Sequence, residues 1–131
     1  MKVRMFRLNK LVRDKILKSN LDMGGKVNYK ILNGDKLNKA LLKKIVEEAK
    51  ELEQETELTA GEIADLQEII DQLIKNYGLS KSEIRAKQVK KRASSGGFIK
   101  GHYITTLTLP ADNKWVDYYA AEPKRFPEIK D

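Results

Sequence analysis

The chain has 131 residues, the size of one domain, and it has no cysteine, which excludes disulfides, thiolate metal sites and a cysteine nucleophile. Its net charge of +7 favours a polyanionic partner such as nucleic acid, a lipid surface or a phosphorylated small molecule. The basic N-terminus lacks the apolar core of a signal peptide, and no apolar run is long enough to span a bilayer. We therefore expect a soluble, cytoplasmic protein with no membrane partner.

The first third of the chain predicts a helix and a short strand. Residues 9–20 have the apolar spacing of a short basic helix, which Gly24 and Gly25 end. Residues 26–32 alternate loosely between polar and apolar side chains and predict a strand, and Asn33-Gly34 after them is a turn signal.

Two longer helices are expected next. Asp35 can cap a helix that runs to about residue 57, with apolar residues on one face. Thr59 is a good N-cap for the following helix, and Glu62 three residues later completes a capping-box pattern. Gly78 should end that helix.

The last third begins with a basic helix that starts at Ser80 and ends near residues 94–97. β-Branched and aromatic residues predict a strand over 98–109, which Pro110 ends. Residues 110–131 have no clear period and are expected to form a C-terminal arm. The fold class is therefore mainly α, a helical bundle with a short peripheral β-hairpin or strands, in a single domain over 1–131.

Acidic residues are concentrated in one segment. Between Glu47 and Asp71 there are ten acidic residues and one basic residue, Lys50, whereas the rest of the chain holds nine acidic and twenty-five basic residues. A basic protein with one dense acidic block is an odd nucleic-acid binder. The pattern suits a phosphate enzyme, in which the acids hold a metal and the bases meet the phosphates.

Four carboxylates of this block fall on or beside helix faces that should be buried. On a helical wheel, Glu48 lies inside the apolar face of its helix and Glu51 at its border, while Glu62 and Asp65 take similar places on the next helix. Burying a carboxylate without a partner costs several kcal/mol, and a hard divalent cation with all-oxygen ligands, Mg²⁺ or Mn²⁺, would resolve the conflict. Runs of Glu are also commonly solvated helix faces, and the pattern alone leaves that alternative open.

Two sequence segments resemble a known enzyme family. Glu47-Glu48-Ala49-Lys50-Glu51 followed by Glu62-Ile63-Ala64-Asp65 is similar to the two-part acidic signature of the MazG-like, all-alpha nucleoside triphosphate pyrophosphohydrolases. Residues 9–16 (NKLVRDKI) and the basic helix running into Gly96-Gly97-Phe98 resemble the phosphoribosyl-ATP pyrophosphohydrolase-like branch. The chain departs from this pattern at Leu17, where relatives commonly have Pro, and at Ser95, where they tend to have a basic residue.

This resemblance implies an all-alpha NTP pyrophosphatase-like fold and hydrolysis of a nucleoside triphosphate, ordinary or modified, to a monophosphate and pyrophosphate. It implies Mg²⁺, or Mn²⁺, held by Glu48, Glu51, Glu62 and Asp65. Glu47 or Glu51 could then orient or deprotonate the attacking water. Phosphoribosyl-ATP is the alternative substrate.

Basic side chains at both ends of the acidic block are candidates for binding the substrate phosphates. Arg13 is favoured among them because a guanidinium matches phosphate geometry. For each lysine, a solvated surface charge is the better single interpretation. The candidates are Lys10, Arg13 and Lys15 from the first helix and Lys87, Lys91 and Arg92 from the basic helix.

The sequence also bears on assembly and on two rival functions. Ile63, Ile70 and Ile74 lie on the far side of their helix from Asp65, and this second apolar surface predicts a homodimer or homotetramer. A nucleic-acid-binding helical module is the rival to an enzyme, but it leaves the inward acids unexplained, so nucleic acid is the less favoured partner. A non-catalytic helical oligomer is the other rival.

Overall fold

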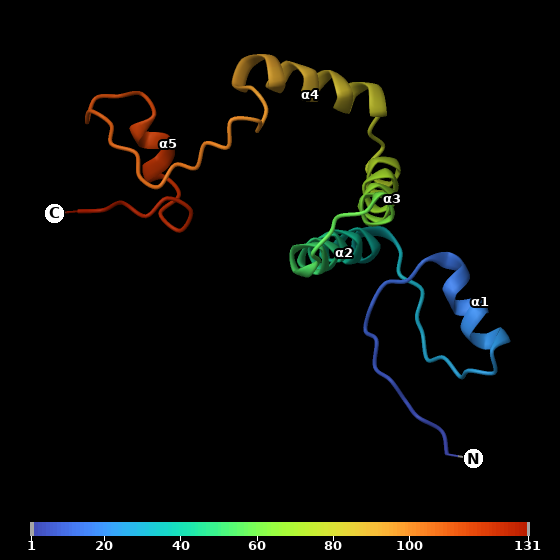
Figure 1. The fold of residues 1–131 in the computed structure, drawn as a ribbon. Helices are drawn as coiled ribbons and strands as arrows, with labels where there is room; N and C mark the ends of the chain where they lie inside the picture. The colour runs from blue at the N-terminus through green and yellow to red at the C-terminus, as the bar shows by residue number, and fades with distance from the viewer. Residues whose placement is uncertain (1, 131) are drawn as a thin grey trace. The chain divides into compact units, whose positions relative to one another are not determined.

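The computed structural model describes residues 2–130, which divide into two compact units, one on each side of the boundary between Lys91 and Arg92. Within the described residues there are five helices and no strand, so the prediction of a mainly α protein is confirmed (Figure 1). None of the helices in this range is both long and apolar enough to cross a membrane.

The first helix, α1 (Asp14–Asp22), starts five residues later than the sequence predicts. Asn9 has a positive φ of 48° and Arg13, at the N-cap, has extended backbone, so residues 9–13 cannot share helical hydrogen bonds. The predicted stop is confirmed. The Gly25 N–H donates to the carbonyl of Asn20, which lies so close that a Cβ on Gly25 would stand 2.8 Å from its oxygen.

Helices α2 (Gly34–Gln54) and α3 (Ala60–Asn76) pack side by side as a hairpin (Figure 1). Asn76 at the end of α3 donates to Asn38 near the start of α2, at 2.9 Å, so the two helices run antiparallel. The buried residues are Leu41 and Ile69, each 6% exposed, one on each apolar face predicted from helical spacing. The core that positions the acidic residues is therefore the seam between these two helices.

The ends of α3 are set by local interactions that the sequence predicts. The Thr59 hydroxyl accepts from the Glu62 N–H at 3.4 Å and the Glu62 carboxylate accepts from the Thr59 N–H at 3.1 Å, which completes the capping box. Gly78, at φ 64°, lets the chain turn left-handed after α3, and the Leu79 N–H then bonds back to the Ile74 carbonyl.

Helix α4 (Lys81–Ser95) begins and ends where predicted, with the Glu83 N–H bonded to the Ser80 hydroxyl at 3.0 Å and Gly96 at φ 82° after its last residue. All of its residues are exposed. It belongs by sequence to both compact units, because the boundary between them falls after Lys91.

The second unit contains one short helix, α5 (Val116–Ala120), which the irregular sequence did not predict. Asn113 prepares its start, because its side chain accepts from the Trp115 N–H at 2.9 Å. The rings of Trp115, Tyr118, Tyr119 and Phe126 then pack on one another at centroid distances of 5.0 to 5.9 Å. The aromatic residues of the predicted arm thus form a small cluster of their own.

The predicted strands at 26–32 and 98–109 are wrong for the structure, in which both segments are irregular. Their β-branched and aromatic residues satisfy strand propensity, but a strand is stable only when a neighbouring strand pairs with its N–H and C=O groups. Phe98, Ile99 and Tyr103 are instead almost fully exposed.

The capping box at Thr59 should contribute to the free energy of unfolding. Thr59→Ala removes the hydroxyl acceptor at the N-terminus of α3 and should lower the free energy of unfolding by about 1 kcal/mol. Thr59→Ser keeps the acceptor and serves as the matched control. Urea unfolding followed by circular dichroism measures both. Equal stability of Thr59→Ala and the unmodified protein would contradict the role given to this cap.

Candidate metal and phosphate site

The two acid pairs lie at the same level of the α2–α3 hairpin. Asn38 and Asn76 are hydrogen-bonded across it. Because antiparallel helices advance by the same rise in opposite directions, Glu48 on α2 comes level with Leu66 on α3, next to Asp65. By the same register Glu51 is level with Ile63, next to Glu62. By this count the two predicted ligand pairs fall at the same level along the hairpin, one pair on each helix.

Glu48 and Asp65 each form an ion pair, and Glu48 is the less exposed of the two. Its side chain is 20% exposed, which agrees with its predicted place on the apolar face of α2. The ammonium of Lys44, one turn earlier and equally enclosed, lies 4.0 Å from a Glu48 carboxylate oxygen. Sequence reasoning missed Lys44, although the spacing of four residues was a usable signal for a pair on one helix face.

Asp65 makes a long-range ion pair with Arg13. The Arg13 guanidinium donates from Nη2 to Asp65 Oδ1 at 2.7 Å, across 52 residues of sequence. The two side chains are 57% and 49% exposed, so water can reach the contact. The structure thus joins a residue predicted to bind phosphate with a residue predicted to bind metal.

The remaining acidic candidates have different surroundings. Glu62 is half-buried and one of its oxygens, Oε2, is engaged in the capping box with Thr59. Glu47 is half-buried and Glu51 is exposed. Both therefore remain accessible to water, as a residue that orients a water molecule must be.

Within residues 2–130, no three His, Asp or Glu side chains are grouped closely enough to hold a metal ion. Three of the four predicted ligands have protein partners instead, Glu48 at Lys44, Glu62 in its cap and Asp65 at Arg13. In their chemistry all four groups are carboxylates, the oxygen donors that a hard divalent cation prefers. A set of four converging ligands stays a prediction.

The predicted phosphate-binding residues are spread over the N-terminal part of the chain and α4. Lys10 is exposed in the segment before α1, Arg13 is the N-cap of α1, and Lys15 is exposed in its first turn. On α4, Lys87 and Arg92 are exposed, and Lys91 lies beside Arg92. Arg13 is in contact with Asp65, one of the predicted metal ligands.

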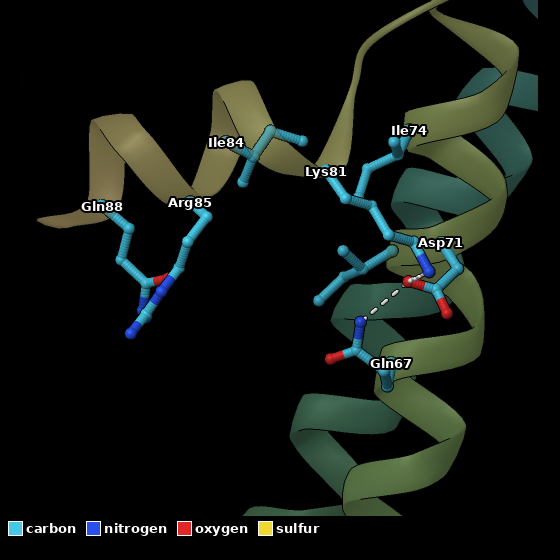
Figure 2. A pocket seen from close by; sticks show the side chains of 8 residues that line it. Gln67, Asp71, Ile74, Lys81, Ile84, Arg85 and Gln88 are labelled. Carbon is cyan, nitrogen blue, oxygen red and sulfur yellow. Dashed lines mark hydrogen bonds and ion pairs between the residues drawn. The ribbon is translucent and has the colours of Figure 1, made fainter.

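An open groove lies between α3 and the first half of α4. Its volume is about 340 Å³, and Ile70, Ile74 and Ile84 form its apolar part. Figure 2 shows Lys81 reaching from α4 to Asp71 on α3, at 3.6 Å, with Gln67 bonded to the same carboxylate at 2.8 Å. This contact fixes the start of α4, whereas Lys87 lies about 9 Å further along the helix, at 1.5 Å per residue.

No protein-family model, curated protein or solved structure matches the chain. The family resemblance therefore rests on the motif residues and on their placement along the hairpin. The structure itself defines a mainly helical protein in which Arg13, Lys44 and two of the predicted acidic ligands form ion pairs.

Proposed function

We propose that this protein is a metal-dependent nucleotide pyrophosphohydrolase that converts a nucleoside triphosphate into a nucleoside monophosphate and pyrophosphate. Glu48, Glu51, Glu62 and Asp65 would hold Mg²⁺ or Mn²⁺. The nucleotide would lie along the acidic seam of the α2–α3 hairpin, with its phosphates toward the basic residues of α1.

One observation carries this proposal above all. The ion pair between Arg13 and Asp65 puts a guanidinium, the side chain best shaped for phosphate, at the acidic seam. An enzyme that hydrolyses a phosphoanhydride needs an anionic metal site and a cationic phosphate site within reach of each other. Arg13 and Asp65, whose side chains are 2.7 Å apart, would supply one member of each site.

The residues would divide the reaction as follows. A divalent cation, when bound, supplies charge neutralisation at the phosphate oxygens and makes a bound water more acidic. Glu47 or Glu51, both accessible to solvent, would orient the attacking water and take up its proton. Arg13, with Lys10 and Lys15, would stabilise the negative charge that gathers on the leaving pyrophosphate.

Two alternatives remain as second candidates. Phosphoribosyl-ATP would serve as a substrate for the same site with the same chemistry. A nucleic-acid-binding helical module is favoured by one observation, the exposure of the whole of α4, which carries six Lys or Arg residues and one Glu. Oligonucleotide binding that falls steeply with salt and is indifferent to Mg²⁺, without pyrophosphate release, would favour the module.

Substitution of the inner carboxylates tests the metal site. Glu48→Gln and Asp65→Asn should reduce turnover by at least about 100-fold, because each removes a negative ligand while keeping its shape. Glu68→Gln is the matched control: Glu68 is exposed on α3, outside the predicted ligand set, and its loss should leave activity unchanged. Pyrophosphate release in Mg²⁺ or Mn²⁺ is the measurement. Full activity of either inner variant, or in excess chelator, would contradict the proposal.

Product identity tests the bond that is cleaved. Attack between the α- and β-phosphates should give equal amounts of nucleoside monophosphate and pyrophosphate from every triphosphate that is turned over. Ion-exchange chromatography of the products, over a panel of ordinary and modified nucleotides and phosphoribosyl-ATP, measures this. Diphosphate and orthophosphate as the only products would reject this enzyme class.

We also propose that the hairpin is completed by a second copy of the chain, as a homodimer or homotetramer. Its outer apolar residues Leu42, Val46, Ile63 and Ile70 are roughly half exposed. An uncovered apolar surface of this kind on a helix pair commonly marks a protein contact.

Light scattering at low protein concentration tests this assembly. Val46→Lys should shift the mass towards that of one chain, because burying an unpaired ammonium at a subunit contact is unfavourable. Lys43→Gln, on an exposed position of the same helix, is the control and should not change the mass. A stable, fully active particle of 15.0 kDa for the unmodified chain would rule out an obligatory oligomer.

A further inference from the structure

The contact between Arg13 and Asp65 places two residues together that cannot both perform their proposed tasks while they are paired. Asp65 Oδ1 accepts from Arg13 Nη2 at 2.7 Å. A carboxylate oxygen that ligates a divalent cation faces a second positive charge at this distance only at an electrostatic cost. A guanidinium held by a carboxylate is likewise not free to take a phosphate.

Glu48 has a cationic neighbour as well. The Lys44 ammonium lies 4.0 Å from its carboxylate, and both side chains are about four-fifths covered. Two carboxylates of the seam are thus accompanied by positive side chains of the chain itself, Lys44 from α2 and Arg13 from the start of α1. These side chains have the role of counter-ions for a dense group of negative charges.

We propose that Arg13 is the resident counter-ion of Asp65 in the metal-free protein, and that an arriving divalent cation displaces its guanidinium and makes it available to the phosphates of the substrate. This inference rests on the proposed function and deepens it, because it assigns Arg13 two partners in sequence. Metal binding would then precede productive binding of the nucleotide.

The geometry of the contact favours displacement. A single nitrogen meets a single oxygen, without the two parallel bonds of the strongest arginine–carboxylate pairs. Both side chains are about half exposed, so solvent and salt screen the attraction. A divalent cation carries twice the charge of one guanidinium and therefore competes well for the Asp65 carboxylate.

The backbone of Arg13 is held by a hydrogen bond, so its side chain can move without the helix. The Arg13 carbonyl accepts from the Ile16 N–H at 3.0 Å, in the first turn of α1, so the backbone of Arg13 is anchored while its side chain reaches outward. The guanidinium can leave Asp65 by rotation of its own side-chain torsions, with no unfolding of α1. Its planar fork then matches a phosphate better than a single carboxylate oxygen.

A titration with Mn²⁺ alone, in which electron paramagnetic resonance measures the free ion, tests the competition. Arg13→Gln should bind Mn²⁺ about two- to fivefold more tightly than the unmodified protein, the upper end being the fold-change that an exposed ion pair can produce. Arg13→Lys keeps a charge at this position and should fall near the unmodified protein. Arg7→Gln, which removes the same charge from the same N-terminal segment, should leave the affinity within about 1.5-fold, since only weak long-range repulsion changes.

Each outcome has a distinct meaning. Equal or weaker Mn²⁺ binding by Arg13→Gln, with measurable binding by the unmodified protein, would overturn the displacement and leave the metal site intact. Absence of Mn²⁺ binding in every protein would remove the metal site and the displacement together. If Arg13→Gln loses helical content, the test uses the unmodified protein and nuclear magnetic resonance. Addition of Mg²⁺ should then move the Arg13 Nε–Hε resonance to the position that it has in the Asp65→Asn variant, where the ion pair is absent. A resonance that does not respond to saturating Mg²⁺ would overturn the displacement.

Discussion

One constraint on this structure is an enclosed carboxylate on the apolar face of α2, the helix that packs against α3. A helix hairpin of this length gains its stability from apolar residues at the seam, and here Glu48 occupies one of those positions with only 20% of its side chain exposed. The ammonium of Lys44 lies 4.0 Å from this carboxylate, and the Arg13 guanidinium pairs with Asp65 on α3 at 2.7 Å, where both side chains are about half exposed. Positive side chains of the chain itself thus accompany two of the carboxylates that we propose as metal ligands.

The small core has a second consequence. Only Leu41 and Ile69 fall below a tenth of their full exposure among the described residues, so the hairpin relies on its caps and on contacts outside itself. The capping box at Thr59 fixes where α3 begins, and hence which turn of α3 presents Glu62 and Asp65 to α2. The exposed apolar residues on the outer faces are the surface behind the proposed assembly. The capping box, the enclosed Glu48 and these apolar residues all belong to one helix pair.

The elements that the sequence predicts correctly are those defined by neighbours within a few residues. The caps at Thr59 and Ser80 and the stops at Gly24, Gly78 and Gly96 depend on local hydrogen bonds and backbone torsions, and all appear in the structure. The strands at 26–32 and 98–109 fail because strand pairing is non-local, and propensity cannot supply a partner. The five-residue helix α5 is too short to show a period in the sequence.

The same distinction applies to the candidate site. Helical spacing is enough to place Glu48 on the packed face of α2, and a spacing of four residues could have revealed Lys44. The pairing of Arg13 with Asp65 joins residues 52 positions apart and follows from no local rule. Motif resemblance selects both residues but assigns them to separate tasks. Their contact, and the competition that it implies, emerges only from the folded arrangement.

The central claim is that the carboxylates of the α2–α3 seam form one cation site. Diffraction from crystals grown with Mn²⁺, recorded at the manganese absorption edge, tests it most directly. The account predicts an anomalous peak between α2 and α3, ligated by Glu48 and Asp65 together with Glu51 or Glu62, and with the Arg13 guanidinium away from Asp65. A fully occupied Mn²⁺ bound only elsewhere, or a seam without manganese in which Arg13 still holds Asp65, would contradict it.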